Sequence, residues 1–303
     1  DGEARHHVLG PEARVRAEVD ALRFAMNRRA RSARSGRGSD GLRAALVPTV
    51  DAGATRLDEL VLGPLRGVIG DRSLVVVPTG CLHAVPWGAL PSCRGRSVSV
   101  CPSATRWLEG DAAASTAVAV AVASGGGPAV LVAGAGITDG SAEVERITPF
   151  YPGSVVLQGA GATIARVLAE VEGADVVHVA AHGCFRWEKP LFSSVELSDG
   201  RLTVYDLERV GRAPRRVVLS SCETGLSGPD VLGIPSALLT LGTEALIASV
   251  VVVSGAEVQD LVVELHRHLS AGARAPDALA RAQESVRGTD AFWAGLGFVC
   301  LGA

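Results

Sequence analysis

Short apolar runs alternate along most of this chain with segments in which apolar residues recur every three or four positions. Both alternating faces of the runs are apolar, as expected for strands of a sheet that helices cover on both sides. The pattern predicts an α/β domain built on a mostly parallel sheet of about six strands. The candidate strands are residues 73–77, 130–133, 154–157, 175–180, 216–220, 245–253 and 298–301.

The first part of the chain has a different pattern. Apolar residues at helical spacing predict one amphipathic helix over residues 11–34, and the Gly- and Ser-rich segment 35–41 predicts a flexible connector. Arginines recur from Arg28 to Arg37 without an intervening acid, which is typical of a solvated helix end or linker; docking to an acidic partner or RNA is the alternative. We therefore predict an N-terminal helix with a basic linker over residues 1–41 and an α/β domain over residues 42–303. Further helices are predicted at residues 54–68, 141–148, 162–171, 229–243, 257–271 and 276–287.

Composition excludes several classes of protein. The chain has 303 residues, of which 48% are hydrophobic and 20% charged, as in folded proteins. Its net charge of -3 argues against a nucleic-acid partner, and no apolar run approaches the ~20 residues that cross a bilayer. The six cysteines are scattered, with no C-x-x-C pair, which predicts reduced thiols in the cytoplasm. The first residue is Asp1 rather than methionine, consistent with the end of a longer polypeptide.

Two predicted strands deliver chemically active side chains at their ends. The segment DVVHVAAHG, residues 175–183, ends on His182 and Gly183, and RVVLSSCETG, residues 216–225, leads to Cys222. Open parallel sheets place ligands and catalytic groups beyond the carboxyl ends of their strands. Because neighbouring strands lie only about 4.8 Å apart, the two loops can bring an imidazole and a thiol into one crevice.

A cysteine nucleophile needs such a neighbour. A free thiol has a pKa near 8.5, so little thiolate exists at neutral pH; a histidine raises that fraction and then protonates the leaving amine. The backbone N–H groups of Gly183 and Cys222 are candidates for an oxyanion hole. A buried histidine or cysteine taken alone is more often structural, and the joint placement at two strand ends favours catalysis.

Three further features near these motifs have structural interpretations. His178 is interpreted as a core histidine, and a zinc site formed with His182 is not expected because that pair belongs on a helix. Cys184 is interpreted as a packing residue, with a metal ligand, a redox partner or the active thiol as alternatives. The segment GAGITDG, residues 134–140, is off register for a dinucleotide loop and is interpreted as a turn. We therefore expect no metal and no cofactor.

The AHG and SSCETG motifs together resemble the CHAT-domain, caspase-like cysteine peptidases, the clan of caspases, separases and gingipains. The likeness extends in the same order along the chain and covers most of residues 42–303. It includes LVVVPTGCLHAVPWGALP (residues 74–91), PLFSSVELSDGRLTVYDL (residues 190–207), which matches the family's hairpin, and FWAGLGFVCLG (residues 292–302), which matches its closing strand.

The resemblance implies a caspase-like αβα sandwich that cleaves peptide bonds in protein substrates, with His182 as general base and acid and Cys222 as nucleophile. It also implies that the loop containing Ser254 and Gly255 helps to form the pocket for the residue before the cut. There the chain departs from the family, which has an aromatic and then an acidic residue where this sequence has Val251 and Gly255. Glu223 is a further candidate for substrate binding, or it caps the following helix.

We therefore expect a cytoplasmic cysteine endopeptidase that acts on a protein substrate under the control of an upstream module or partner protein, for instance a helical-repeat module. The alternative from another class is a catalytically silent caspase-like module that serves as a regulatory or scaffolding domain. A nucleotide-binding α/β domain, based on the Gly134 loop alone, is a third hypothesis. No nucleic acid and no membrane are expected as partners.

Overall fold

A single eight-stranded sheet forms the centre of the computed structural model, which describes residues 4–33, 39–108, 128–136, 138–184, 192–220 and 234–302. Along the sheet the strands follow the order β1 (Leu74–Val76), β2 (Val98–Val100), β11 (Phe298–Gly302), β10 (Ala245–Ser249), β9 (Arg216–Leu219), β5 (Val176–Ala180), β3 (Ala129–Ala133) and β4 (Val155–Leu157).

The sheet is mostly parallel, as predicted. Every neighbouring pair is parallel except β10 with β11, so the five strands from β10 to β4 share one direction. Each predicted apolar run contains one strand. The sheet is larger than the expected six or so strands, and the sequence pattern misses β2, where Ser99 between two valines leaves too short an apolar run.

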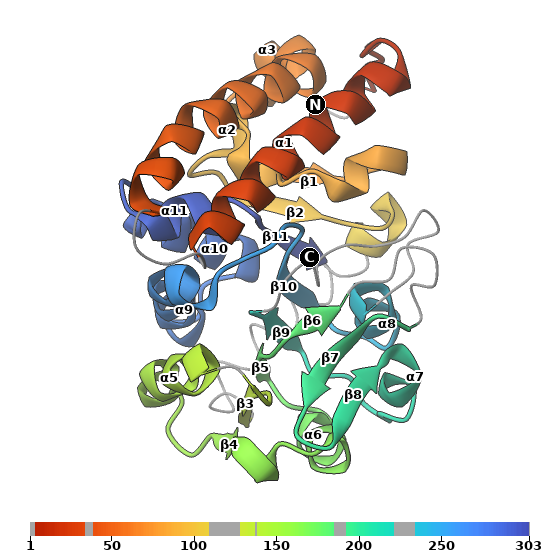
Figure 1. Cartoon of the computed structure of the whole chain (residues 1–303). Helices are drawn as coiled ribbons and strands as arrows, with labels where there is room; N and C mark the ends of the chain where they lie inside the picture. The colour runs from red at the N-terminus through yellow and green to blue at the C-terminus, as the bar shows by residue number, and fades with distance from the viewer. Residues whose placement is uncertain are drawn as a thin grey trace.

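Helices cover both faces of the sheet (Figure 1). On one face lie α5 (Thr138–Ile147), α9 (Gly255–Ser270), α10 (Ala275–Ser285) and α11 (Asp290–Gly295). On the other lie α6 (Ile164–Val171) and α8 (Ile234–Thr240). All of β3, β5, β10 and β11 is buried, which explains why these strands are apolar on both sides. Residues 229–233 of the predicted helix before β10 lie outside the described residues.

A small antiparallel sheet stands beside the main one (Figure 1). It consists of β6 (Gly183–Cys184), β7 (Ser194–Leu197) and β8 (Gly200–Thr203), followed by the short helix α7 (Val204–Leu207). β7 and β8 form the hairpin that the family resemblance implies. Because β6 starts directly after His182, this small sheet is attached to the carboxyl end of β5.

Two long helices begin the described chain, α1 (Glu12–Ala33) and α2 (Ser39–Val61). The predicted first helix is confirmed. Residues 39–41 of the predicted connector belong to α2, which begins at Ser39 and passes through Pro48, much earlier than the sequence pattern indicates. Residues 34–38 lie outside the described residues. The predicted boundary between residues 41 and 42 falls within α2.

Short helical turns complete the connections. After α2 come η1 (Gly63–Leu65), α3 (Arg66–Ile69), η2 (Gly80–Ala84), η3 (Trp87–Ala89) and η4 (Pro91–Cys93), and the later turns are η5 (Thr148–Phe150) and η6 (Gly159–Gly161). The predicted low-complexity segment 112–127 lies outside the described residues. Within the part of the chain that the structure describes, no helix is long and apolar enough to cross a membrane.

The buried face of α1 belongs to the same hydrophobic core as the sheet. Leu22 is fully buried, and its Cδ1 would lie 3.6 Å from a Cβ built at Gly53 of α2, so its side chain faces that helix. Leu22→Ala is therefore expected to lower the free energy of unfolding by about 2–5 kcal/mol in urea titrations, because it leaves a cavity. Phe24→Ala on the same helix is the control: Phe24 is 67% exposed, and a change above about 0.5 kcal/mol there would contradict this packing.

Candidate functional site

Three parallel strands end side by side at the edge of the sheet where the sequence places its reactive residues. β5 pairs with β9 with Val179 opposite Leu219, and β9 pairs with β10 with Leu219 opposite Ala248. His182 follows Val179 by three residues. The loops leaving β5, β9 and β10 therefore start level with one another at a single edge. Ligand sites of open parallel sheets lie at this edge, beyond the carboxyl ends of the strands.

His182 is exposed at this edge, and its backbone is held on both sides. Its carbonyl oxygen accepts a hydrogen bond from the Glu196 N–H of β7 at 2.8 Å. Gly183, half-buried, begins β6 and pairs with Val195. The His182 side chain is therefore exposed, while the backbone that carries it is hydrogen-bonded to β7. Cys222 and Glu223 lie outside the described residues.

The loop after β3 packs against the same strand end. Gly134 donates its N–H to the Ala180 carbonyl oxygen at 2.8 Å. A Cβ at Gly134 would lie 2.4 Å from the Glu196 carbonyl oxygen and 2.6 Å from the Ala181 Cβ. Only glycine fits this position, because both neighbours are too close for any side chain. The segment interpreted as a turn therefore also fixes the approach of β7 to β5, just before His182.

The β10 loop carries the predicted substrate-binding pair. Ser254 is only 8% exposed and precedes α9, whose first residue is the half-buried Gly255. A Cβ at Gly255 would meet Asp139 of α5 at 3.2 Å. An acidic side chain thus lies against the backbone position where the family resemblance leads one to expect an acid. Sequence reasoning missed Asp139, although an acid shortly after the β3 strand end was the available signal.

The described thiols fall into two groups. Cys81, Cys93, Cys101 and Cys300 are buried, whereas Cys184 is exposed on β6. Burial raises the pKa of Cys93 to about 12 and that of Cys101 to about 11, and raises the pKa of Cys81 and Cys300 as well. These four thiols are protonated at neutral pH and unreactive. The interpretation of Cys184 as a packing residue is wrong, because its side chain is exposed.

His178 is a core histidine, as predicted. It is fully buried within β5, and its Nδ1 lies 3.1 Å from Nε2 of the equally buried His266 on α9. The Tyr151 hydroxyl lies 2.9 Å from His266 Nδ1. At the other end, His178 Nε2 lies 2.9 Å from Glu143 Oε1 of α5, at ion-pair distance but without hydrogen-bond alignment. A polar chain therefore runs through the core from Tyr151 to Glu143.

The partners assign the protons in this chain. With the proton of His178 placed on Nε2, which faces Glu143 at 2.9 Å, His178 Nδ1 accepts from the Nε2–H of His266, and His266 Nδ1 accepts from the Tyr151 hydroxyl. His266 is neutral in this arrangement. Burial, with smaller contributions from His178 and Arg216, holds the pKa of His266 well below its usual range. The group is a structural connection between β5 and α9 and lies in the core rather than at the exposed edge.

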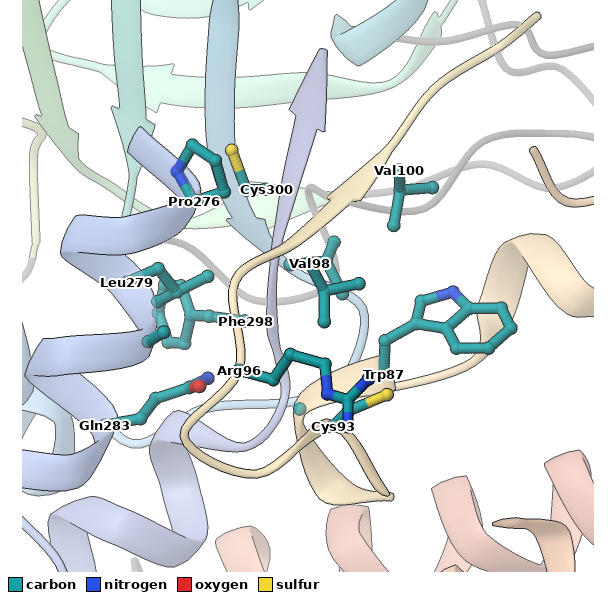
Figure 2. Close-up of a pocket in the computed structure, with 13 residues that line it drawn as sticks. Trp87, Cys93, Arg96, Val98, Val100, Pro276, Leu279, Gln283, Phe298 and Cys300 are labelled. Atoms are coloured by element: carbon teal, nitrogen blue, oxygen red, sulfur yellow. The ribbon is translucent and has the colours of Figure 1, made fainter. Parts of the chain in front are cut away.

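A separate pocket lies between β2, β11, η3 and α10 (Figure 2). Its lining includes Trp87, Arg96, Gln283 and Phe298, and it contains neither His182 nor the β10 loop. Its cavity volume is about 20 Å³, which accommodates one water molecule but no peptide side chain. This pocket is therefore no substrate site. Among the described residues, no group of three or more His, Cys, Asp or Glu side chains could bind a metal ion.

The arrangement of sheet, helices and strand-end histidine is a caspase-like α/β fold. It is similar to the structure of separase from Saccharomyces cerevisiae in complex with securin, with a TM-score of 0.53 and 11% identity over 76% of this chain. It is also similar to the complex of Porphyromonas gingivalis RgpB pro- and mature domains, with a TM-score of 0.52 and 11% identity over 96% of this chain and 77% of that one. At such identities the likeness shows the fold alone.

Residues 51–303 match the family model described as the CHAT domain, and the chain therefore belongs to the CHAT domain family. This confirms the resemblance drawn from the motifs. The chain spans 16% of the separase chain to which it is similar. A comparison with curated protein sequences finds no significant match.

The buried His266 makes stability depend on pH. In the unfolded chain its pKa is near 6.5, so below that pH the unfolded state binds a proton that the folded state does not. Its contribution to stability is complete above about pH 6.5 and falls as the pH drops, by about 1.4 kcal/mol between pH 7.5 and 5.5. Urea titrations at both pH values should show this loss in the wild type and a smaller loss in His266→Gln. Equal losses in the two proteins would contradict the assignment.

Proposed function

We propose that this chain is a cysteine-type endopeptidase that hydrolyses peptide bonds through His182 and Cys222. The observation that carries the proposal is the register of β5 with β9, in which Val179 lies opposite Leu219. In the sequence, His182 follows Val179 by three residues, and Cys222 follows Leu219 by three. Membership in the CHAT domain family and the caspase-like fold support a peptidase-like module.

In the proposed reaction the Cys222 thiolate attacks the carbonyl carbon of the scissile bond after His182 accepts the thiol proton. The N–H groups of Gly183 and Cys222 donate to the developing oxyanion. His182 then protonates the leaving amine, and the C–N bond breaks to give a thioester. Water, deprotonated by the same imidazole, attacks that thioester and releases the new carboxylate and the free thiol. Each step uses groups of the chain and water, with no metal or cofactor.

The state of the other thiols supports this assignment. The four buried cysteines have raised pKa values and no access to a substrate. Of the two remaining thiols, Cys184 is the competitor for the role of nucleophile, because it is exposed and lies two residues beyond His182. A reagent that marks the reactive sulfur therefore has to distinguish Cys222 from Cys184.

Substrate and control belong to the same proposal. The substrate is a protein, and Glu223, Ser254 and Gly255 are proposed to contact it, Ser254 after movement of its loop. We place the chain in the cytoplasm and its peptidase domain over residues 42–303. Separase was solved with securin, which favours a bound regulatory partner here too. A catalytically silent scaffolding module remains the competing function, favoured by the burial of Ser254.

Labelling tests the proposed nucleophile. A peptide-based electrophile at pH 7.5 is expected to modify Cys222, as located by mass spectrometry of the digested protein. Modification should be lost in Cys222→Ala and retained in Cys184→Ala. Hydrolysis of a peptide library should likewise disappear in Cys222→Ala, and His182→Ala should slow it by about 10²- to 10⁴-fold, the usual contribution of a general base.

The controls separate chemistry from folding. All three variants should unfold at the same urea midpoint as the wild type, since His182 and Cys184 are exposed and the Cys222 change removes one sulfur atom. A label on Cys184 would show that the proposal names the wrong nucleophile. A wild type that is neither labelled nor active on any peptide, with or without candidate partners, would favour the silent module.

A further inference from the structure

The N-terminal helix α1 makes direct hydrogen bonds to the loop that follows β10. The Val252 N–H donates to Oδ1 of Asn27 at 2.8 Å, and Nε of Arg23 donates to the Val250 carbonyl oxygen at 3.3 Å. Asn27 and Arg23 are one helical turn apart on α1, so one face of the helix contacts the loop. In Figure 1 the C-terminal end of α1 lies beside the chain that runs from β10 to α9.

A group of charged side chains, of which Arg29 and Glu257 are buried, connects α1 and α2 to the helix after this loop. Arg29 of α1 is 3% exposed and Glu257 of α9 is 6% exposed, and their charged atoms lie 3.8 Å apart. Arg43 of α2 donates to the same Glu257 carboxylate at 2.8 Å. Arg29 also pairs with Asp290 at the start of α11. Removing one partner of a buried ion pair typically costs several kcal/mol of stability, because the other charge is left uncompensated, so these pairs oppose separation of α1 and α2 from α9.

Two further hydrogen bonds hold the start of the loop beside the sheet. The Val250 N–H donates to the Gly297 carbonyl oxygen at 3.0 Å, and the Val251 N–H donates to the Ser249 hydroxyl at 3.2 Å. From Val252 onward the chain turns away from β10 toward α9. There the Val252 N–H donates a hydrogen bond to Asn27 Oδ1, an acceptor on a different helix and far away in the sequence.

The position of this loop matters for the site. β10 neighbours β9 in parallel, so the loop leaves the sheet next to the chain that leads to Cys222. The loop contains Ser254 and precedes Gly255, which is packed against Asp139. Its placement therefore determines where these groups stand relative to a bound peptide.

We propose that Asn27 is a positioning residue for the β10 loop, through which the position of α1 sets substrate affinity at the His182 edge. The proposal rests on the proposed function. Asn27 lies before residue 51, where the match to the CHAT domain begins. Substrate affinity is thus controlled from a helix outside the matched segment, and any partner that displaces α1 loosens the loop.

Three variants test the role of the Asn27 oxygen. Asn27→Ala removes the acceptor of the Val252 N–H. Asn27→Asp keeps an acceptor of the same size at the same place and is the rescue variant. Glu18→Gln is the matched control on the same helix. It weakens the ion pair of Glu18 with Arg56 of α2, at 3.0 Å, which lies away from the β10 loop.

Hydrogen exchange of the full chain measures the loop directly. Loss of one hydrogen bond, worth about 1 kcal/mol, should speed exchange in the peptide containing Val252 by about fivefold in Asn27→Ala. Exchange in β9 and β5 should not change. Asn27→Asp and Glu18→Gln should match the wild type in the loop. Equal rates in the alanine variant and the wild type would overturn the proposal, and so would equal acceleration in Asn27→Asp.

Kinetics measure the consequence at the site. With a peptide substrate, Asn27→Ala should raise KM by about threefold to tenfold and leave kcat within about twofold, with rescue in Asn27→Asp. A fall in kcat at constant KM would also overturn the positioning role. If the wild type shows neither hydrolysis nor labelling of Cys222, the proposed function fails, while the exchange rates alone still decide whether Asn27 positions the loop.

Discussion

The pairing of β5 with β9 is the constraint on which the rest of the structure depends. Two parallel strands that share a register must end at the same edge, and their loops therefore start within one strand spacing of each other. The pair is held at the start of its strands by the ion pairs of Asp175 with Arg215 and Arg216, and the contact of His178 with His266 of α9 holds β5 at its centre. A one-residue slip of β5 against β9 would shift His182 relative to the start of the loop that follows β9.

Burial also separates the titratable groups into those that pack in the core and those that are exposed. Cysteines within the core have raised pKa values and act as small apolar residues, and burial holds the pKa of His266 well below its usual range. His182 lies only four residues beyond His178 on the same segment, yet it is exposed. The same residue type thus packs inside the sheet at one position and is exposed at the sheet's edge four residues later.

The sequence predicted the strands well because each is an uninterrupted apolar run, and it predicted the edge on which His182 lies. It did not predict β2, which has one serine among three residues, nor the early start of α2, where Pro48 and glycines weaken the helical pattern. The contact of His178 with His266 joins residues 88 positions apart. The approaches of Asn27 to Val252 and of Asp139 to Gly255 are likewise tertiary, and no local pattern reports them.

The arginines near the end of α1 show how a charged pattern can mislead. A run from Arg28 to Arg37 is typical of a solvated segment, yet Arg29 is buried against Glu257 and Asp290. Burying a guanidinium is unfavourable unless carboxylates and hydrogen bonds compensate, and replacing such a cluster by apolar residues is often neutral or stabilising. Stability alone therefore does not account for this cluster. The cluster connects α1 and α2 to α9, the helix into which the β10 loop leads, so its placement matches a role in holding these helices beside that loop.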